Sequence, residues 1–313
     1  MAVKIVTDST ADLPIQLARE LGITVVPVYV RFGNKVYRDR VDISEDEFYQ
    51  RLLGSRVHPT TSQPTPTDFA DAYTKLSKES DEIVSIHLSS KTSGTYNSAL
   101  QGRELVGEKC HIEVVDSRSV SMGLGLVAMA AARLAGTGES LPRVMDEVGQ
   151  AMAHIRLLGV LDTLKYVLKG GRIGKAKALL GGMLQVKPLL TMREGELFPA
   201  GLVRTRAKGL ERLYEWVKSV LNIQELAIVH STTPGEALSL KERIASILAG
   251  ERIHLARLGP ALGVHGGPGT LILALREKRS GIGQEASQGK LASRRFSLPS
   301  LPIPKLGFSC PHL

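Results

Sequence analysis

The chain has 313 residues, more than a typical single domain holds, and this length favours two domains or one elaborate α/β domain with an appendage. Hydrophobic residues make up 43% and charged residues 23%, but aromatic residues only 4%, so an aliphatic core is expected. The net charge is +9, but four basic residues and one acid lie in residues 281–313, which leaves +6 for the rest. No basic run with interleaved aromatic residues occurs, so we expect no nucleic-acid partner, whereas transient contact with an anionic membrane surface is compatible with the charge.

Cysteine usage and the apolar runs narrow the cellular setting. Cys110 and Cys310 stand 200 residues apart, which is neither a disulfide framework nor a metal-ligand spacing, so we expect a reducing compartment and no metal. The opening MAVKIVTDSTADLP lacks the charged and apolar regions of a signal peptide. No uninterrupted apolar run reaches the roughly 18 residues that a membrane span requires. The sequence therefore predicts a soluble, cytoplasmic protein.

The first half of the chain alternates short apolar runs with helical patterns. This alternation predicts parallel strands joined by crossover helices. Ser44 with Glu47 is typical of a capping box, and Thr65 before Pro66 is typical of a helix start. Residues 122–136 are apolar almost all round, which predicts a buried helix. The other predicted elements are the strands KIVTD, TVVPVYVRF, EIVSIHL and IEVVD and the helices at residues 13–21 and 45–53.

Beyond about residue 153 the pattern changes to longer helices and hairpin-like pieces. LLTMREGELFPAG predicts a hairpin with its turn at Glu194 and Gly195. Helical periodicity returns on both sides of the strand ELAIVH, in residues 208–221 and 236–248, which indicates a second α/β domain. The expected organisation is an N-terminal α/β domain in residues 1–152, a C-terminal α/β domain in residues 153–280, and a Pro-rich, disordered tail in residues 281–313.

Four segments concentrate Gly, Ser, Thr or His where the strands of an α/β sheet would end. In VTDSTAD, residues 6–12, a turn that merely caps the next helix explains the polar side chains equally well. PTTSQPTP, residues 59–66, is a hydroxyl-rich loop that its prolines make rigid. In LGPALGVHGGPGT, residues 258–270, glycines let another group approach the backbone near His265, which favours a binding role over an ordinary surface or core role.

The remaining segment, LSSKTSGTYNSA, leads from a predicted strand into a predicted helix. Ser93, Gly94 and Thr95 fall at the N-terminus of that helix, where free N–H groups and the positive end of the dipole favour an anion. Capping alone also explains them, because Ser and Thr are preferred capping residues.

These segments, in this order, resemble the DegV family. The similarity runs from VTDST through TSQPT, SSKTSGTYNSA, VVDSRSVSMGLG, KGGRIG, VKPLL and RTRAKG to GPALGVHGGPG, and covers residues 1 to about 275. It implies a two-domain α/β fold, with an N-terminal, mainly parallel three-layer α/β domain and a C-terminal α/β domain with a mixed sheet. After His265 the sequence departs from the family pattern, because TLILALREKRS runs into the tail, so we expect the last strand to end early.

The resemblance also implies a function. One long-chain fatty acid would lie in a buried tunnel between the domains, and a bacterial fatty acid kinase would phosphorylate the carboxylate that this protein presents. Arg172 of KGGRIG matches a surface position that contacts the kinase. No cofactor is implied besides the fatty acid as ligand. The expected carboxylate site comprises Thr61, Ser62, Ser93, Gly94, Thr95, Arg204 and His265.

The physical chemistry of these residues suits a fatty acid. A carboxylate that leaves water needs charge-assisted hydrogen bonds, which hydroxyls, helix N-terminal N–H groups and a nearby His or Arg supply. Burial of a chain of about sixteen carbons would contribute on the order of 10 kcal/mol before any cost. The segments GLGLVAMAAARLAG and KALLGGMLQ either line the tunnel or form ordinary core.

Two alternative functions stay open. Ser93 activated by His265 would make a serine-type acyl hydrolase, but the sequence has no G-x-S-x-G elbow and no motif that identifies an orienting carboxylate. The same helix N-terminus would also suit a phosphate ligand, but no G-x-x-x-x-G-K-[ST] loop is present. We therefore expect a carrier with no catalytic residue rather than an enzyme.

Overall fold

The computed structural model describes residues 2–179, 186–248 and 252–278. The predicted disordered tail, residues 281–313, lies outside the described residues. The chain from Met1 to Lys278 forms one compact unit, in which residues 4–116 and residues 155–277 contribute separate sheets. A domain boundary near residue 153 stays a prediction.

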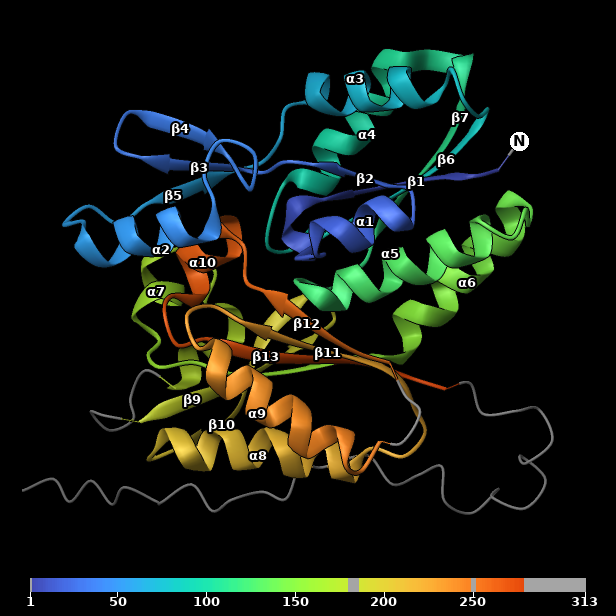
Figure 1. Cartoon of the computed structure of the whole chain (residues 1–313). Helices are drawn as coiled ribbons and strands as arrows, with labels where there is room; N and C mark the ends of the chain where they lie inside the picture. Colours follow the sequence, from blue (N-terminus) through green and yellow to red (C-terminus); the bar gives the residue numbers. More distant parts are fainter. Residues whose placement is uncertain (1, 180–185, 249–251, 279–313) are drawn as a thin grey trace, which may run out of the picture. The chain divides into compact units, whose positions relative to one another are not determined.

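Four parallel strands form the first sheet (Figure 1), in the order β2-β1-β6-β7. Both faces are covered, as is usual for parallel strands joined by crossover helices. On one face, Phe69 and Tyr73 of α3 pack with Ala99 of α4 against Val6 and Ile83 of the strands. The elements are β1 (Lys4–Asp8), β2 (Ile23–Val26), β6 (Glu82–His87), β7 (His111–Asp116), α1 (Ile15–Glu20), α3 (Pro66–Leu76) and α4 (Thr95–Val106). The predicted start of α3 is confirmed, since Thr65 and Asp68 form a capping box there.

The predicted strand TVVPVYVRF is two strands that belong to different sheets, so the prediction of one strand is wrong. The chain leaves the parallel sheet after β2 and enters the three-stranded antiparallel sheet β4-β3-β5. Pro27, between β2 and β3, has no N–H to donate to a ladder, and Val28 N–H donates instead to Ser9 Oγ (3.0 Å). The elements of this part are β3 (Tyr29–Phe32), β4 (Lys35–Arg38), β5 (Thr60–Ser62) and α2 (Glu45–Gly54).

Six strands form the mixed sheet, in the order β10-β9-β8-β13-β11-β12. The strands are β8 (Ile155–Val160), β9 (Lys187–Arg193), β10 (Glu196–Val203), β11 (Ile223–His230), β12 (Arg252–Arg257) and β13 (Leu271–Glu277). The predicted hairpin is confirmed as β9 and β10, whose turn residues Glu194 and Gly195 both have positive φ. The last described strand, β13, runs to Glu277 and pairs with both β8 and β11 inside the sheet.

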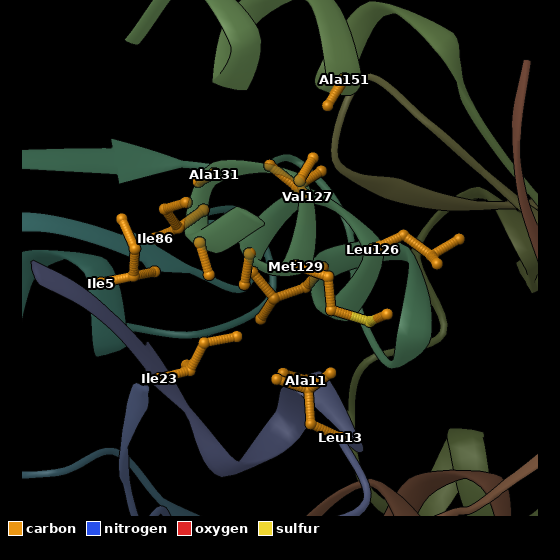
Figure 2. Close-up of a cluster of buried hydrophobic side chains, with 14 of the residues drawn as sticks. Ile5, Ala11, Leu13, Ile23, Ile86, Leu126, Val127, Met129, Ala131 and Ala151 are labelled. Carbon is orange, nitrogen blue, oxygen red and sulfur yellow. The ribbon is translucent and has the colours of Figure 1, made fainter. Parts of the chain in front are cut away.

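Helix α5 (Met122–Ala135) lies between the two large sheets (Figure 1) and contacts strands of both. Ile5 and Ile86 of the parallel sheet approach it from one side (Figure 2), and Leu126, Val127 and Met129 of α5 belong to the same buried cluster. That cluster also includes Leu157 of β8 and residues of α6 (Leu141–His154). The prediction of a buried helix is confirmed. On the other face of the mixed sheet pack α8 (Arg206–Ser219) and α9 (Pro234–Ala245).

A buried cluster of charged side chains joins loops that follow strands of all three sheets. Asp12 accepts hydrogen bonds from Ser121 Oγ (2.6 Å) and Gly259 N–H (2.8 Å), and Arg40 Nη2 lies 3.4 Å from it. Asp39 accepts a hydrogen bond from Ser9 Oγ (2.7 Å). Burial raises the pKa of Asp12 to about 6 and that of Asp39 to about 7, although the Arg40 guanidinium opposes both shifts. The same guanidinium also pairs with Glu45 (3.1 Å), so three carboxyl groups lie around Arg40.

Among the described residues, none of the helices combines the length and the apolar character needed to cross a bilayer.

Candidate functional site

A cavity of about 370 Å³ opens between the carboxyl ends of the parallel strands and the inner face of the mixed sheet. Its wall draws residues from the β6–α4 loop, from β5, from β8, β9 and β13, and from the helices α7 (Lys165–Lys169) and α10 (Pro260–Gly266). In a parallel sheet, loops at the carboxyl ends of the strands are the usual place for a ligand. The fold therefore brings segments that are far apart in sequence to one hollow.

Most of the wall is aliphatic. No residue of α5 lines the cavity among the described parts of the chain, so GLGLVAMAAARLAG forms ordinary core. Of KALLGGMLQ, residues 180–185 lie outside the described residues. The three hydroxyls that lie apart from the predicted site, those of Thr10, Thr191 and Thr270, already donate to protein oxygens. The main aliphatic wall residues are Leu157, Leu161, Leu190, Met192, Leu258 and Ile272.

Thr61 and His265, which are 204 residues apart in sequence, meet in this wall. Thr61 Oγ1 lies 3.1 Å from His265 Nε2. The β5 strand, with its neighbour β3, holds Thr61 in place, and α10 carries His265. Gly170 abuts the imidazole so closely that any side chain there would collide with it. Ser62, the next residue after Thr61, also lines the cavity and is exposed.

His265 is held in its neutral form. Burial lowers its pKa to about 4, and the nearby positive charge of Arg172 and the neighbouring His58 act in the same direction. Its Nδ1 atom is buried without a hydrogen-bond partner among the described residues. A neutral imidazole offers one donor and one acceptor, so this side chain can contribute a hydrogen bond but no full charge.

The loop that leads into α4 forms another part of the wall, through Thr92 and Ser93, whereas Gly94 and Thr95 do not line the cavity. Ser93 lines the cavity, and its Oγ lies 2.9 Å from Thr95 Oγ1 and accepts from Thr95 N–H (3.3 Å). Gly94 caps the helix without a side-chain hydrogen bond. A side chain at Gly94 would collide with Gln63, which also lines the cavity. Ser93 thus accepts a hydrogen bond from the first N–H group of the helix, as the capping interpretation expects, and anion binding stays a prediction.

Arg172 lies in the cavity wall, although the sequence placed it on a partner-binding surface. It is exposed, and its Nε donates to the Thr92 carbonyl (3.4 Å) while its Nη1 donates to the Gly170 carbonyl (2.9 Å). One guanidinium is thus close to the polar part of the hollow and also reachable from outside. A position in the cavity wall is therefore compatible with contact between Arg172 and a partner protein.

Arg204 is not brought to the cavity. It is exposed where β10 gives way to α8, and it does not line the hollow. The neighbouring basic residue in the same motif, Arg206, points inward and pairs with Glu236 (2.6 Å) and the Gly269 carbonyl (2.5 Å). Two residues along a chain that is entering a helix face different directions, and RTRAKG alone does not distinguish them.

Gln63 and Thr92 are polar wall residues beside the predicted site that were not themselves predicted. Both lie inside segments that the sequence had marked, TSQP and SSKTSG. Gln63 Nε2 donates to Ser98 Oγ of α4 (3.2 Å), so it links the β5 loop to the helix N-terminus. Asp8, in the first marked segment, accepts from Thr10 N–H (3.0 Å) and caps a short turn, which is the capping interpretation.

The geometry expected of a hydrolase is incomplete at the cavity. His265 faces Thr61, and no carboxylate among the described residues orients its Nδ1. A Ser–His–Asp chain does occur elsewhere: His87 lies 2.7 Å from Ser85 Oγ and 3.0 Å from Asp8 Oδ2. All three side chains are fully buried, so no substrate reaches Ser85, and the chain serves to tie β1 to β6.

Within residues 2–179, 186–248 and 252–278, no group of three His, Cys, Asp or Glu side chains is arranged to hold a metal ion.

Related proteins match almost the whole described chain. A DegV domain-containing protein of Caldanaerobacter subterraneus is 34% identical over 279 residues, 88% of this chain and 99% of that protein. Another, from Deinococcus radiodurans, is 36% identical over 88% of this chain and 98% of that protein.

Solved structures agree with these relatives. A DegV family protein of Thermus thermophilus, described as binding fatty acid, matches with a TM-score of 0.81 and 35% identity over 89% of this chain and 100% of that one. DegV of Bacillus subtilis, described as a fatty acid binding protein, matches with a TM-score of 0.82 and 29% identity over the same shares. The predicted resemblance and the α/β fold with a parallel and a mixed sheet are thereby confirmed. Because the family described as "Uncharacterised protein, DegV family" matches residues 2–278, the chain belongs to the DegV family.

Proposed function

We propose that this protein binds one long-chain fatty acid in its cavity and is a carrier rather than an enzyme. The observation that carries the proposal is a hollow whose wall is mainly aliphatic, with a polar part that includes Thr61, Ser62, Ser93 and His265. Such a wall matches a ligand with a hydrocarbon tail and one anionic end.

The polar part supplies what a carboxylate needs when it leaves water. Hydroxyl groups and helix N-terminal N–H groups donate hydrogen bonds, and the dipole of the twelve-residue α4 favours negative charge. The neutral His265 adds a hydrogen-bonding group, and Arg172 adds a positive charge nearby. Arg204 is left out of the proposed carboxylate site because it does not line the cavity.

The solved relatives support the choice of ligand. The proteins of Thermus thermophilus and Bacillus subtilis are described as binding fatty acids, and a similar structure from Eubacterium ventriosum, 29% identical with a TM-score of 0.81, is described as a stearic acid-binding protein. We transfer this ligand class to the present chain because the fold and the aliphatic hollow are in place.

The proposal extends to presentation of the carboxylate to a fatty acid kinase in the bacterial cytoplasm, for formation of an acyl phosphate, with transient contact at a membrane surface to exchange the lipid. In that reaction a carboxylate oxygen attacks the terminal phosphorus of ATP and ADP leaves, so the carrier need supply no catalytic group. Ser62 and Arg172 are exposed at the cavity wall, and we infer that the ligand's head lies within reach of an enzyme docked there.

The test is non-denaturing mass spectrometry of freshly purified protein, followed by extraction and identification of the lipid. The expected result is a mass increment equal to one long-chain fatty acid, lost on denaturation. A protein that neither arrives with a fatty acid nor takes one up from solution would contradict the proposal. Ester hydrolysis that Ser93→Ala abolishes would favour the hydrolase instead.

A further inference from the structure

We propose that Gly159 determines how far a hydrocarbon chain enters the cavity, and thereby sets the longest fatty acid that fits. This inference rests on the proposed function and adds to it a residue that determines chain length. Gly159 is buried in the middle of the mixed sheet, on β8, and it lines the cavity.

The alternation of β8 puts Gly159 on the cavity face. Leu157, Gly159 and Leu161 line the hollow, whereas Leu158 and Val160 belong to the core on the opposite face, beneath α8 and α9. The neighbouring strands continue the pattern, because Gly159 pairs with Leu190 of β9 on one side and with Ile272 of β13 on the other. Both of these residues line the cavity as well.

Gly159 is therefore a gap at the centre of an aliphatic wall. Leucines stand before and after it along the strand, and Leu190 and Ile272 flank it across the sheet. A methyl group added at Gly159 would have Ile272 Cγ1 at 3.2 Å as its nearest neighbour, and the next two atoms also belong to β13. All three nearest atoms thus lie within the sheet, and a larger side chain would project into the cavity.

The gap separates two parts of the wall. Leu161 and Leu190 pack in a small cluster with Val167 of α7, close to Gly170 and His265. Leu157 instead packs in the large core cluster around α5, together with the half-buried Met192. Along β8, Leu157 and Leu161 are about 13 Å apart. A carboxylate held near His265 directs its tail past Gly159 towards Leu157, so a side chain at Gly159 would close off the deeper part.

The experiment compares the wild-type protein with Gly159→Val and Gly159→Ala in binding saturated fatty acids of graded length, from about ten to about eighteen carbons. Each methylene that loses its burial lowers affinity about fourfold. The expected result for Gly159→Val is a loss of tenfold or more for the longest acids and little change for the shortest, with Gly159→Ala between the two. Both variants are checked for folding by circular dichroism, and the milder Ala variant serves if Val does not fold.

Two further variants separate the cavity from the strand. Gly159→Val combined with Ile272→Ala removes volume beside the added side chain and is expected to restore binding of long acids. Val160→Ala weakens the same strand on the opposite face and is expected to leave the length preference unchanged. A folded Gly159→Val protein that keeps the wild-type length profile, or that loses all lengths equally, would overturn the inference. Failure of the wild-type protein to bind any fatty acid would instead refute the proposed function on which it rests.

Discussion

His265 and Ser93 both line the cavity at the proposed carboxylate site. Because each would donate a hydrogen bond to a buried anion, we expect Ser93→Ala and His265→Ala each to weaken fatty acid binding by roughly 1–3 kcal/mol. Arg204→Ala is the matched control, since Arg204 is exposed outside the cavity wall. Equilibrium binding of a fluorescent fatty acid measures all three. Equal losses in the control, or none in the two site variants, would contradict the assigned site.

Arg172 allows binding and presentation to be distinguished. It lies in the cavity wall and is exposed, so its charge can act on the ligand, on a partner, or on both. We expect Arg172→Ala to retain fatty acid and to be phosphorylated slowly by a fatty acid kinase. Lys175→Ala removes the same charge from the same exposed segment without altering the cavity wall, and is expected to behave as wild type. A normal phosphorylation rate for Arg172→Ala would exclude the partner contact.

For single residues, the sequence indicated which polar side chains lie near strand ends, but not which of them lie close together in the fold. Thr61, Ser62, Ser93 and His265 were all marked by local composition, and the structure brings them to one wall. Arg204 and Arg206 are indistinguishable in RTRAKG, because the choice of inward residue depends on how α8 docks. The gap at Gly159 cannot be recognised from the local sequence either, since neighbouring residues on two other strands form it.

Among the elements, the β9–β10 hairpin is attached to the parallel sheet at its turn. Ser89 Oγ donates to the Gly195 carbonyl (2.7 Å), and a side chain on Gly195 would collide with Ser89. We therefore expect Gly195→Ala to destabilise the protein by about 1 kcal/mol from its positive φ and by a further amount from the collision. Gly33→Ala is the control, because Gly33 has positive φ but open space around it. Denaturant unfolding of both variants should show the larger loss of unfolding free energy for Gly195→Ala. Equal losses in the two variants would exclude a role for the Ser89 contact.

Periodicity and caps predicted most elements of the fold, and their failures have local causes. The buried helix and the hairpin follow from patterns within a dozen residues, as does the start of α3. The division of TVVPVYVRF into β2 and β3 depends on Pro27, whose effect on a strand is decided by the ladder that its neighbours find. The order of strands within a sheet depends on contacts that no single segment encodes.

For the whole unit up to Lys278, the buried pair Asp12 and Asp39 predicts a dependence of stability on pH. Burial raises the pKa of Asp39 from 3.8 to about 7 in the folded state, so its contribution to stability is fully present below about pH 3.8 and is lost progressively as pH rises from there to about 7. Asp39→Asn abolishes this pH-dependent loss of stability, because the asparagine amide does not ionise. We expect the variant to gain stability relative to wild type by on the order of 1–3 kcal/mol between about pH 5 and about pH 8.

Thermal or denaturant unfolding across this pH range checks the prediction. Asp42→Asn is the control, because its hydrogen bonds from Arg38 hold the pKa of Asp42 at about 2, far below the range tested. An Asp39→Asn protein with the same pH slope as wild type would show that Asp39 is already ionised in the folded state.

The position of α5 has a consequence for any attempt to divide this molecule. Its apolar surface faces strands on two sides, so neither the residues before it nor those after it can shield that surface alone. A fragment that ends between α6 and β8 would expose the apolar surface of this helix to water. We expect such a fragment to aggregate rather than fold as an independent domain. Recombining pieces from related chains will therefore succeed only when this helix and both of its neighbouring sheets come from the same parent.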